Sequence, residues 1–412
     1  MVNKSKKYRK DAKINKEKKT DYNYYGIISR RLKYLKMLLS ALLFVGVCAG
    51  FIFIEELTLQ NINMLWRYID ILPAGRVTAS EFRIDTDEFS RVGFHRNNIA
   101  VLRRSRLEIY DTGGRRRSVF QLAYSHPVLR ISERYILAYD LGANQLDIFS
   151  TVAHVFEYSG EYPIFNARVT DRGFIAYVTR ATGYRSVIRV LNNNFAEMYA
   201  VHRVNDFIMD ADIDERANWL VAAGYYARGG DYISSILLYS TDLLEPVAEI
   251  EIQGELAYRV NLNERGFSVL LENSIRFYDL RGVELGRYNL AGRTLQLFEM
   301  GGKLSALVLS ERVLGSDGRI LIFNNDGSII WEQTIGAEII DIKFCVSYDY
   351  LYFLTRAGLY KINIESGTFE LFVARINEYG EAGYDETTRS IIFADGRNII
   401  LAGLSRVNIL ER

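Results

Sequence analysis

The chain has 412 residues, of which 49% are hydrophobic and 13% aromatic, and it contains only 4 prolines. This composition argues against long proline-rich disordered linkers and provides enough apolar sequence for a large core or several domains. The net charge of +1 divides unevenly, because residues 1–36 carry 13 basic and 3 acidic side chains, a net charge of +10, and the remainder carries −9. A basic tail on an acidic body is typical of an interaction tail.

Residues 37–54 are the first predicted structural element, an apolar segment of 18 residues without a charge. A helix of that length rises about 27 Å, close to the thickness of a bilayer core, so we predict a single transmembrane helix over 37–54. Because basic residues precede it, we expect residues 1–36 in the cytoplasm and the body outside the cell membrane. A cleaved signal peptide and a lipoprotein attached at Cys48 are the alternatives. Cys48 and Cys345 predict no disulfide.

The basic tail predicts contact with anionic lipid, worth about 1 kcal/mol for each basic residue close to the membrane surface. Nucleic acid is not an expected partner, because the adjacent apolar segment explains the lysines more simply. Residues 55–75 follow as a predicted amphipathic linker, in which apolar residues recur every three or four positions from Ile62 to Leu72, ahead of Pro73. Such a helix lies at the membrane interface or packs under the body.

Residues 76–412 show a repeated pattern of short apolar runs separated by turn residues. The third run of each unit lies at 107–111, 146–150, 187–192, 236–240, 275–279, 320–324, 359–364 and 398–403. The centres of successive runs are 38 to 49 residues apart. A period near 40 with four strands per unit predicts an all-β fold, an extracytoplasmic β-propeller with eight blades, or with seven if one weak unit is not a blade.

Closure of this ring can be predicted from its two ends, because an open sheet edge invites aggregation. The last unit has no fourth strand after the run at 398–403. We therefore predict that residues 76–84 form the outer strand of the last blade, which joins the two ends of the domain. Residues 405–410 compete for the same place.

The architecture of residues 76–412 resembles the WD-repeat and quinoprotein-like superfamily of propellers. More narrowly, the chain resembles an uncharacterised family of Gram-positive bacterial proteins with a basic tail, one membrane span and an extracytoplasmic propeller. The resemblance does not extend to motifs, because "IYD", "FYD" and "IFN" replace the Trp-Asp ending, and Trp219 and Trp331 do not form the docking pattern of quinone-binding propellers. It implies a fold and a location, and it transfers no catalytic residue and no cofactor.

Sequence motifs for catalysis are absent, since the chain contains no G-x-S-x-G, H-E-x-x-H or P-loop pattern. The histidines have no short ligand spacing, and neither a zinc site nor a cofactor is predicted. These histidines are His95, His126, His154 and His202.

The segment "DADIDE" at 210–215 offers weak metal candidates in Asp210, Asp212 and Asp214. It lacks the glycine and the glutamate that a calcium loop requires at its sixth and twelfth positions. In a strand, alternate aspartates point to one face, which here is the wall of the central channel or a turn. We therefore expect a structural role for these three residues.

Two groups of charged residues are candidates for binding a partner. Arg115, Arg116 and Arg117 lie at a predicted hairpin tip, where they form a solvated turn or capture an anionic partner such as a wall polymer. The second group lies on predicted inner strands, facing a wet central channel. It consists of Arg130, Arg168, Arg259, Asp341, Lys343 and Glu381.

We expect these features to serve a membrane-anchored binding scaffold or sensor for a protein or a cell-envelope polymer, because the loops of a rigid frame usually carry the function of such a fold. The alternative is a propeller lyase or hydrolase that acts on cell-wall carbohydrate. That activity would need clustered acid and base groups over the channel mouth. The sequence assigns no residue to such a role.

Overall fold

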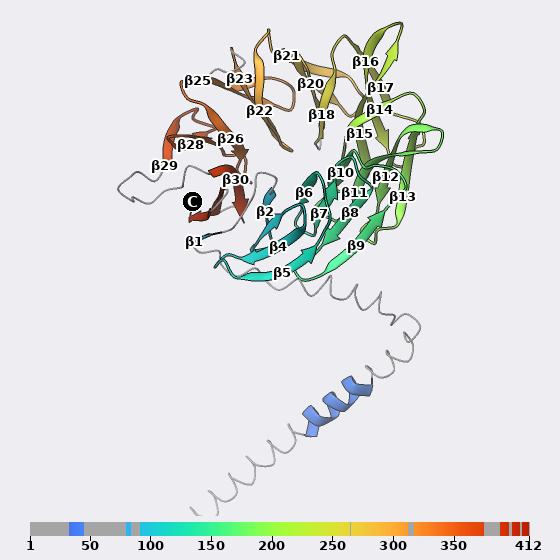
Figure 1. The fold of residues 1–412 in the computed structure, drawn as a ribbon, viewed down its shortest axis with the longest axis vertical. Coiled ribbons are helices and arrows are strands. Elements are labelled where there is room, and N and C mark those ends of the chain that lie inside the picture. The colour runs from blue at the N-terminus through green and yellow to red at the C-terminus, as the bar shows by residue number, and fades with distance from the viewer. Residues whose placement is uncertain are drawn as a thin grey trace, which may run out of the picture. The chain divides into compact units, whose positions relative to one another are not determined.

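The unit Asp70–Arg412 contains eight four-stranded antiparallel sheets, which are the blades of a β-propeller (Figure 1). The computed structural model describes residues 33–44, 80–83, 91–263, 265–311, 317–374, 388–394, 398–403 and 406–411. Blades 1 to 7 each take four consecutive strands, and the first of the four is the innermost. The predicted eight-bladed fold is thus confirmed.

The first four blades contain β2 to β17. Blade 1 contains β2 (Arg91–His95), β3 (Asn98–Leu102), β4 (Arg106–Asp111) and β5 (Arg116–Gln121). Blade 2 contains β6 (Pro127–Ile131), β7 (Ile136–Asp140), β8 (Gln145–Phe149) and β9 (His154–Ser159). Blade 3 contains β10 (Asn166–Val169), β11 (Ile175–Ala181), β12 (Tyr184–Leu191) and β13 (Glu197–Arg203). Blade 4 contains β14 (Phe207–Ile213), β15 (Trp219–Arg228), β16 (Asp231–Ser240) and β17 (Ala248–Gln253).

The other four blades contain β18 to β32 and β1. Blade 5 contains β18 (Ala257–Leu262), β19 (Gly266–Leu271), β20 (Ser274–Asp279) and β21 (Glu284–Asn289). Blade 6 contains β22 (Thr294–Met300), β23 (Leu304–Ser310), β24 (Gly318–Asn324) and β25 (Ile329–Ile335). Blade 7 contains β26 (Ile339–Phe344), β27 (Tyr350–Thr355), β28 (Gly358–Asn363) and β29 (Phe369–Ala374). Blade 8 contains β30 (Thr388–Ala394), β31 (Asn398–Gly403), β32 (Arg406–Glu411) and β1 (Ser80–Arg83).

Blade 8 closes the ring with strands from both ends of the domain. Its strand order is β30, β31, β32 and β1, so β1, from the predicted segment 76–84, is the outer strand, as expected. The rival segment 405–410 is the third strand instead. One prediction was wrong, because the run at 398–403 is the second strand of its blade and not the third. The other seven aligned runs are third strands. The predicted position of the aligned strand within its blade is therefore wrong by one strand, and only in the last blade.

The core explains why the second strands read as continuous apolar runs. In β7, Ile136 and Ala138 pack against blade 1, while Leu137 and Tyr139 pack against blade 3. Both faces of each blade are buried, so the strand does not alternate between apolar and polar residues. The turn after β7 was predicted from Gly142, which has a φ of 82° in the structure.

Eight separate hydrophobic clusters fill the eight interfaces between neighbouring blades. The cluster between the first and last blades joins Ile99 and Val101 of β3 to Ile400, Val407 and Ile409. Closure therefore rests on apolar packing as well as on the pairing of β1 with β32.

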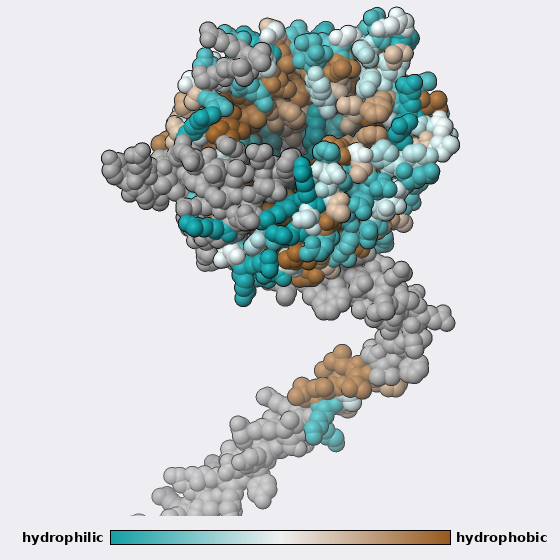
Figure 2. Space-filling model, in the orientation of Figure 1, coloured by the Kyte–Doolittle hydropathy of each residue, from teal (hydrophilic) through white to brown (hydrophobic). Residues whose placement is uncertain are grey.

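In the unit Met1–Ile69, one helix covers residues 33–44. Its large apolar side chains are exposed, and most of it is brown in Figure 2. Among the described residues, no helix combines the length and the apolar character needed to cross a membrane. Of the predicted span 37–54, only 37–44 is described, and the predicted linker 55–75 lies outside the described residues.

Candidate functional site

Charged side chains of four neighbouring inner strands meet near the axis of the ring. Arg130 lies on β6, Arg168 on β10, and Arg259 on β18, all within electrostatic reach of one another. Between them, β14 contributes Asp210 and Asp212, two residues apart and therefore on one face of the strand. We call these five residues the arginine–aspartate cluster.

Asp210 is the centre of this cluster and is almost fully buried. One carboxylate oxygen accepts a hydrogen bond from the Asn166 side-chain amide at 2.7 Å. The other accepts from the Val260 backbone N–H at 3.0 Å and lies 3.5 Å from the guanidinium groups of both Arg168 and Arg259. A register shift between Ile208 and Asp210 accompanies this placement. A buried charge needs such partners, and Asp210 therefore ties three blades together.

Asp212, two residues after Asp210 on β14, faces the guanidinium group of Arg168. It accepts a hydrogen bond from the Leu262 backbone N–H at 2.8 Å and lies 3.9 Å from Arg168 Nε. Burial raises the pKa of Asp212, and Arg168 opposes this effect. Asp214 does not join the cluster, since its carboxylate accepts from the backbone N–H groups of Arg216 and Trp219 in its own turn. The aspartates of this segment thus bind amides and guanidinium groups.

Arg130 is the member of the cluster that has no acidic partner in the described part of the chain. Within the described residues, its side chain forms one hydrogen bond, from Nη1 to the Leu129 carbonyl at 3.2 Å. Its Nε is buried and has no hydrogen-bond partner among these residues. Burial lowers the pKa of Arg130, and the positive charges of Arg168 and Arg259 lower it further. The cluster therefore has three guanidinium groups for two carboxylates and an unused donor.

A second charged cluster lies on the inner strands of the later blades. Lys343 of β26 forms an ion pair with Glu299 of β22 at 2.7 Å. Asp341 of β26 accepts a hydrogen bond from the Ile391 backbone N–H at 2.7 Å. Burial raises the pKa of Asp341 to about 6. We call Glu299, Asp341 and Lys343 the lysine–glutamate cluster; the predicted inner-strand residue Glu381 lies outside the described residues.

The three consecutive arginines lie on the outer side of blade 1, away from both clusters. Arg115 and Arg117 approach Asp111 at 3.2 and 3.6 Å, and Arg116 approaches the buried Glu108 at 3.3 Å. Each arginine therefore has a carboxylate partner on its own hairpin. The side chains of Arg115, Arg116 and Arg117 are nevertheless 79%, 58% and 50% exposed. The structure brings none of them to the inner strands.

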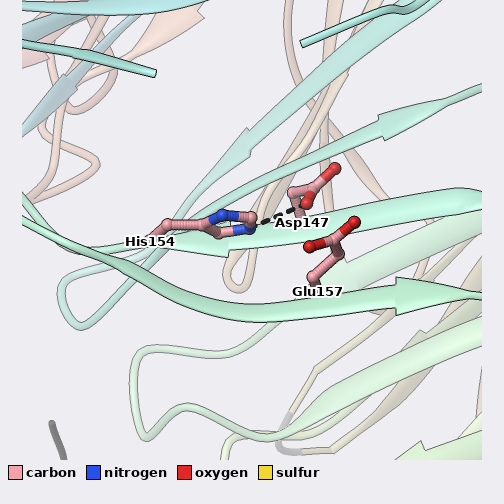
Figure 3. Close-up of side chains that lie close together, drawn as sticks. All are labelled: Asp147, His154 and Glu157. Atoms are coloured by element: carbon pink, nitrogen blue, oxygen red, sulfur yellow. Dashed lines mark ion pairs between the residues drawn. The ribbon is translucent and has the colours of Figure 1, made fainter. Parts of the chain in front are cut away.

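A third cluster was not predicted from the sequence, because its members come from two strands. His154 Nε2 lies 2.7 Å from Asp147 Oδ1, and the Glu157 carboxylate lies beside them (Figure 3). Asp147 is on β8, whereas His154 and Glu157 are on β9. The pairing of third and fourth strands was the available signal, since it places Asp147 opposite Glu157.

The other histidines do not join a cluster of acidic side chains among the described residues. His95 ends β2 and is buried, with Nδ1 at 2.9 Å from the Ser132 carbonyl. His202 lies on β13 and packs its ring against Tyr184. Within the described part of the chain, no histidine reaches either inner-strand cluster.

Comparisons with known proteins agree with this fold. The family model described as "Family of unknown function (DUF5711)" matches residues 76–367. The C-terminal WD40 domain of Sif2 is similar with a TM-score of 0.55 and 11% identity, over 82% of this chain and 99% of that one. A eukaryotic initiation factor is similar with a TM-score of 0.51 and 13% identity, over 80% and 84% of the two chains. No curated protein matches the sequence.

Proposed function

The chain belongs to the family of unknown function DUF5711, and we propose that it is a membrane-anchored, extracytoplasmic propeller scaffold of a Gram-positive cell. In this proposal the ring is a rigid frame that binds a protein or a cell-envelope polymer through an anionic group. The observation that carries the proposal is the arginine–aspartate cluster, in which Arg130 has no acidic partner among the residues that the structure describes. The fold resembles WD40 propellers, which supports a scaffold role by analogy only.

Charge and geometry favour a carboxylate or phosphate as the bound group. The cluster presents three guanidinium groups and two carboxylates, and both carboxylates already accept backbone N–H bonds. Guanidinium groups match planar or tetrahedral oxyanions with paired hydrogen bonds, which are about twice as strong as bonds between neutral groups. An incoming anion would supply the acceptor that Arg130 Nε lacks. Arg168 and Arg259 are partly exposed, at 19% and 25%, so the cluster is accessible to solvent.

Membrane anchoring rests on the N-terminal unit. Residues 1–36 carry a net charge of +10, and residues 37–54 carry none. In the described helix 33–44, leucines such as Leu42 and Leu43 are 62% and 67% exposed. Contiguous apolar surface of this kind is unfavourable in water and favourable in lipid. We propose that the helix lies in the membrane, that the tail contacts anionic lipid on the cytoplasmic side, and that the propeller is outside.

The partner can be identified by crosslinking in intact membranes. Cells that carry the full chain are treated with a crosslinker, and the attached molecules are identified by mass spectrometry. The wild type and Arg115→Gln are expected to recover the same amount of the same partner. With Arg130→Gln, the amount of crosslinked partner should fall at least tenfold. Arg115 is the matched control, because it is an exposed arginine with its own carboxylate partner.

Two outcomes would count against this function. Recovery of lipids alone, or of nothing, would remove the scaffold role, and equal recovery with Arg130→Gln would remove the arginine–aspartate cluster from it. Location has a separate test, since protease added to protoplasts should digest the propeller and leave the basic tail protected. Digestion of the tail with protection of the propeller would reverse the proposed orientation.

A further inference from the structure

The hairpin of β8 and β9 places three metal-ligating side chains on one face of blade 2. Asp147 pairs with Glu157, and Phe149 pairs with His154. Asp147 and Phe149 are two residues apart and point to the same face. A register shift between Ile148 and Phe149 brings the ring of His154 beside Asp147. The convergence is therefore a consequence of strand pairing and not of residues adjacent in sequence.

The three groups have the chemistry and the spacing of a metal site. One imidazole nitrogen and two carboxylate oxygens lie within 4.8 Å of one another (Figure 3). In a tetrahedral site, zinc bonds of about 2.0–2.2 Å place neighbouring ligand atoms about 3.3–3.6 Å apart. The distance of 2.7 Å between His154 Nε2 and Asp147 Oδ1 would have to increase by about 0.6–0.9 Å. His154 and Glu157 are exposed, so their side chains can make this adjustment.

Negative charge is in excess around this cluster. Asp140, Asp147 and Glu157 all act electrostatically on Tyr124. Asp147 forms an ion pair with His154. Within the described residues, the Glu157 carboxylate has no hydrogen bond and no ion pair. A divalent cation would balance this charge and would use the free oxygens of Glu157.

The groups behind the cluster orient its members. The Tyr124 hydroxyl donates to Asp147 Oδ2, which leaves Oδ1 directed at the histidine. The His154 ring stacks on Phe149 with a centroid distance of 4.6 Å and an interplanar angle of 22°. Partners of this kind, on the far side of a carboxylate or an imidazole, are what fix the ligands of metal sites in proteins.

We propose that Asp147, His154 and Glu157 bind a divalent transition-metal ion, with zinc as the preferred ion. Imidazole together with carboxylate oxygens suits zinc and its neighbours in the first transition row. Three protein ligands leave at least one coordination position open to water or to an atom of a bound partner. The competing arrangement is a histidine–aspartate ion pair without metal, in which Glu157 has no part.

Calorimetric titration with zinc chloride separates the two arrangements. The full chain, purified in detergent without a histidine tag, is treated with a chelator, dialysed and titrated. The wild type should bind one zinc ion through Asp147, His154 and Glu157. His154→Ala should lower the affinity at least a hundredfold, and Glu157→Gln about tenfold. His202→Ala is the matched control, because His202 lies on the corresponding fourth strand of blade 3 with its ring against Tyr184.

The outcomes decide the proposal even if one variant folds poorly. Glu157 is exposed and forms no hydrogen bond or ion pair among the described residues, so Glu157→Gln should keep the unfolding temperature of the wild type. The proposal is overturned if the wild type binds no zinc, or if Glu157→Gln binds it as tightly as the wild type. The proposal is also overturned if His154→Ala binds zinc with the affinity of the wild type. Arg130→Gln should leave zinc binding intact, which keeps this test independent of the scaffold function.

Discussion

The two charged clusters on the inner strands balance their charges in opposite ways. In the arginine–aspartate cluster, Asp210 has two guanidinium groups at 3.5 Å, and the third arginine, Arg130, has no carboxylate partner within the described ranges. In the lysine–glutamate cluster, the single ammonium group of Lys343 pairs with Glu299 at 2.7 Å, and Asp341 is left with backbone amides. One cluster has a surplus of cations and the other a surplus of carboxylates.

The inner strands are therefore not a uniform polar lining. A surplus guanidinium predicts attraction of an anion, and this is why the proposed binding function rests on blades 2 to 5. A surplus carboxylate that is buried predicts protonation, since burial disfavours its charged form. The same residue type on equivalent strands should therefore respond to the same substitution with opposite signs.

The largest expected effect is the loss of stability in Asp210→Asn. The substitution removes the charge that Arg168 and Arg259 share in a mostly buried place. Breaking such a set typically costs about 3 kcal/mol or more of unfolding free energy. Denaturant unfolding of the purified chain measures it. Asp214→Asn is the control, because Asn can cap the same turn as Asp. Equal effects of the two substitutions would contradict the central role assigned to Asp210.

The opposite sign is expected for Asp341→Asn. The pKa of Asp341 lies above its usual 3.8, at about 6, so the native state binds a proton more tightly than the unfolded state. This contribution to stability is present below pH 4 and is lost as the pH rises through 6. At pH 7.5 the variant should be more stable by up to about 3 kcal/mol. Unfolding at pH 4 and 7.5 tests the sign, because the advantage should vanish at the lower pH.

Much of the fold could be predicted from the sequence, because each blade buries both faces of its second and third strands. Runs such as 107–111 and 146–150 therefore recur with a period near 40, and the outer strand β1 followed from the need to close the ring. The rank of β31 in blade 8 could not be predicted. Rank is set by which strand forms the hydrogen bonds on each side, and β30, β31 and β32 have similar apolar patterns.

The candidate sites could be predicted only in part, because their geometry depends on register. Alternation was enough to place Arg130, Arg168 and Arg259 on the inner strands. It could not show that Asp210 would be their partner, because that contact depends on the irregularity after Ile208 and on two neighbouring blades. The cluster around His154 was missed for the same reason, since a register shift in another blade creates it.

A smaller effect is expected from Arg130→Met, which separates this arginine from its neighbours. The replacement removes a buried guanidinium that has no carboxylate partner among the described residues. We therefore expect the free energy of unfolding to stay the same or to rise by up to about 1 kcal/mol. Arg168→Met is the matched variant and should be destabilising, because it leaves Asp210 and Asp212 with fewer partners. Thermal unfolding of both variants gives the comparison. If Arg130→Met is the more damaging of the two, then Arg130 has a structural role and is not a spare donor.

The smallest expected effect belongs to Arg115, which has the same side chain and a carboxylate partner but lies in solvent. Arg115 is 79% exposed and its ion pair with Asp111 at 3.2 Å is screened by water and salt. Arg115→Gln should therefore change the unfolding free energy by less than about 0.5 kcal/mol. Added salt should alter the stability of this variant and of the wild type equally. A larger loss than in Arg168→Met would mean that burial does not separate the hairpin arginines from the arginine–aspartate cluster.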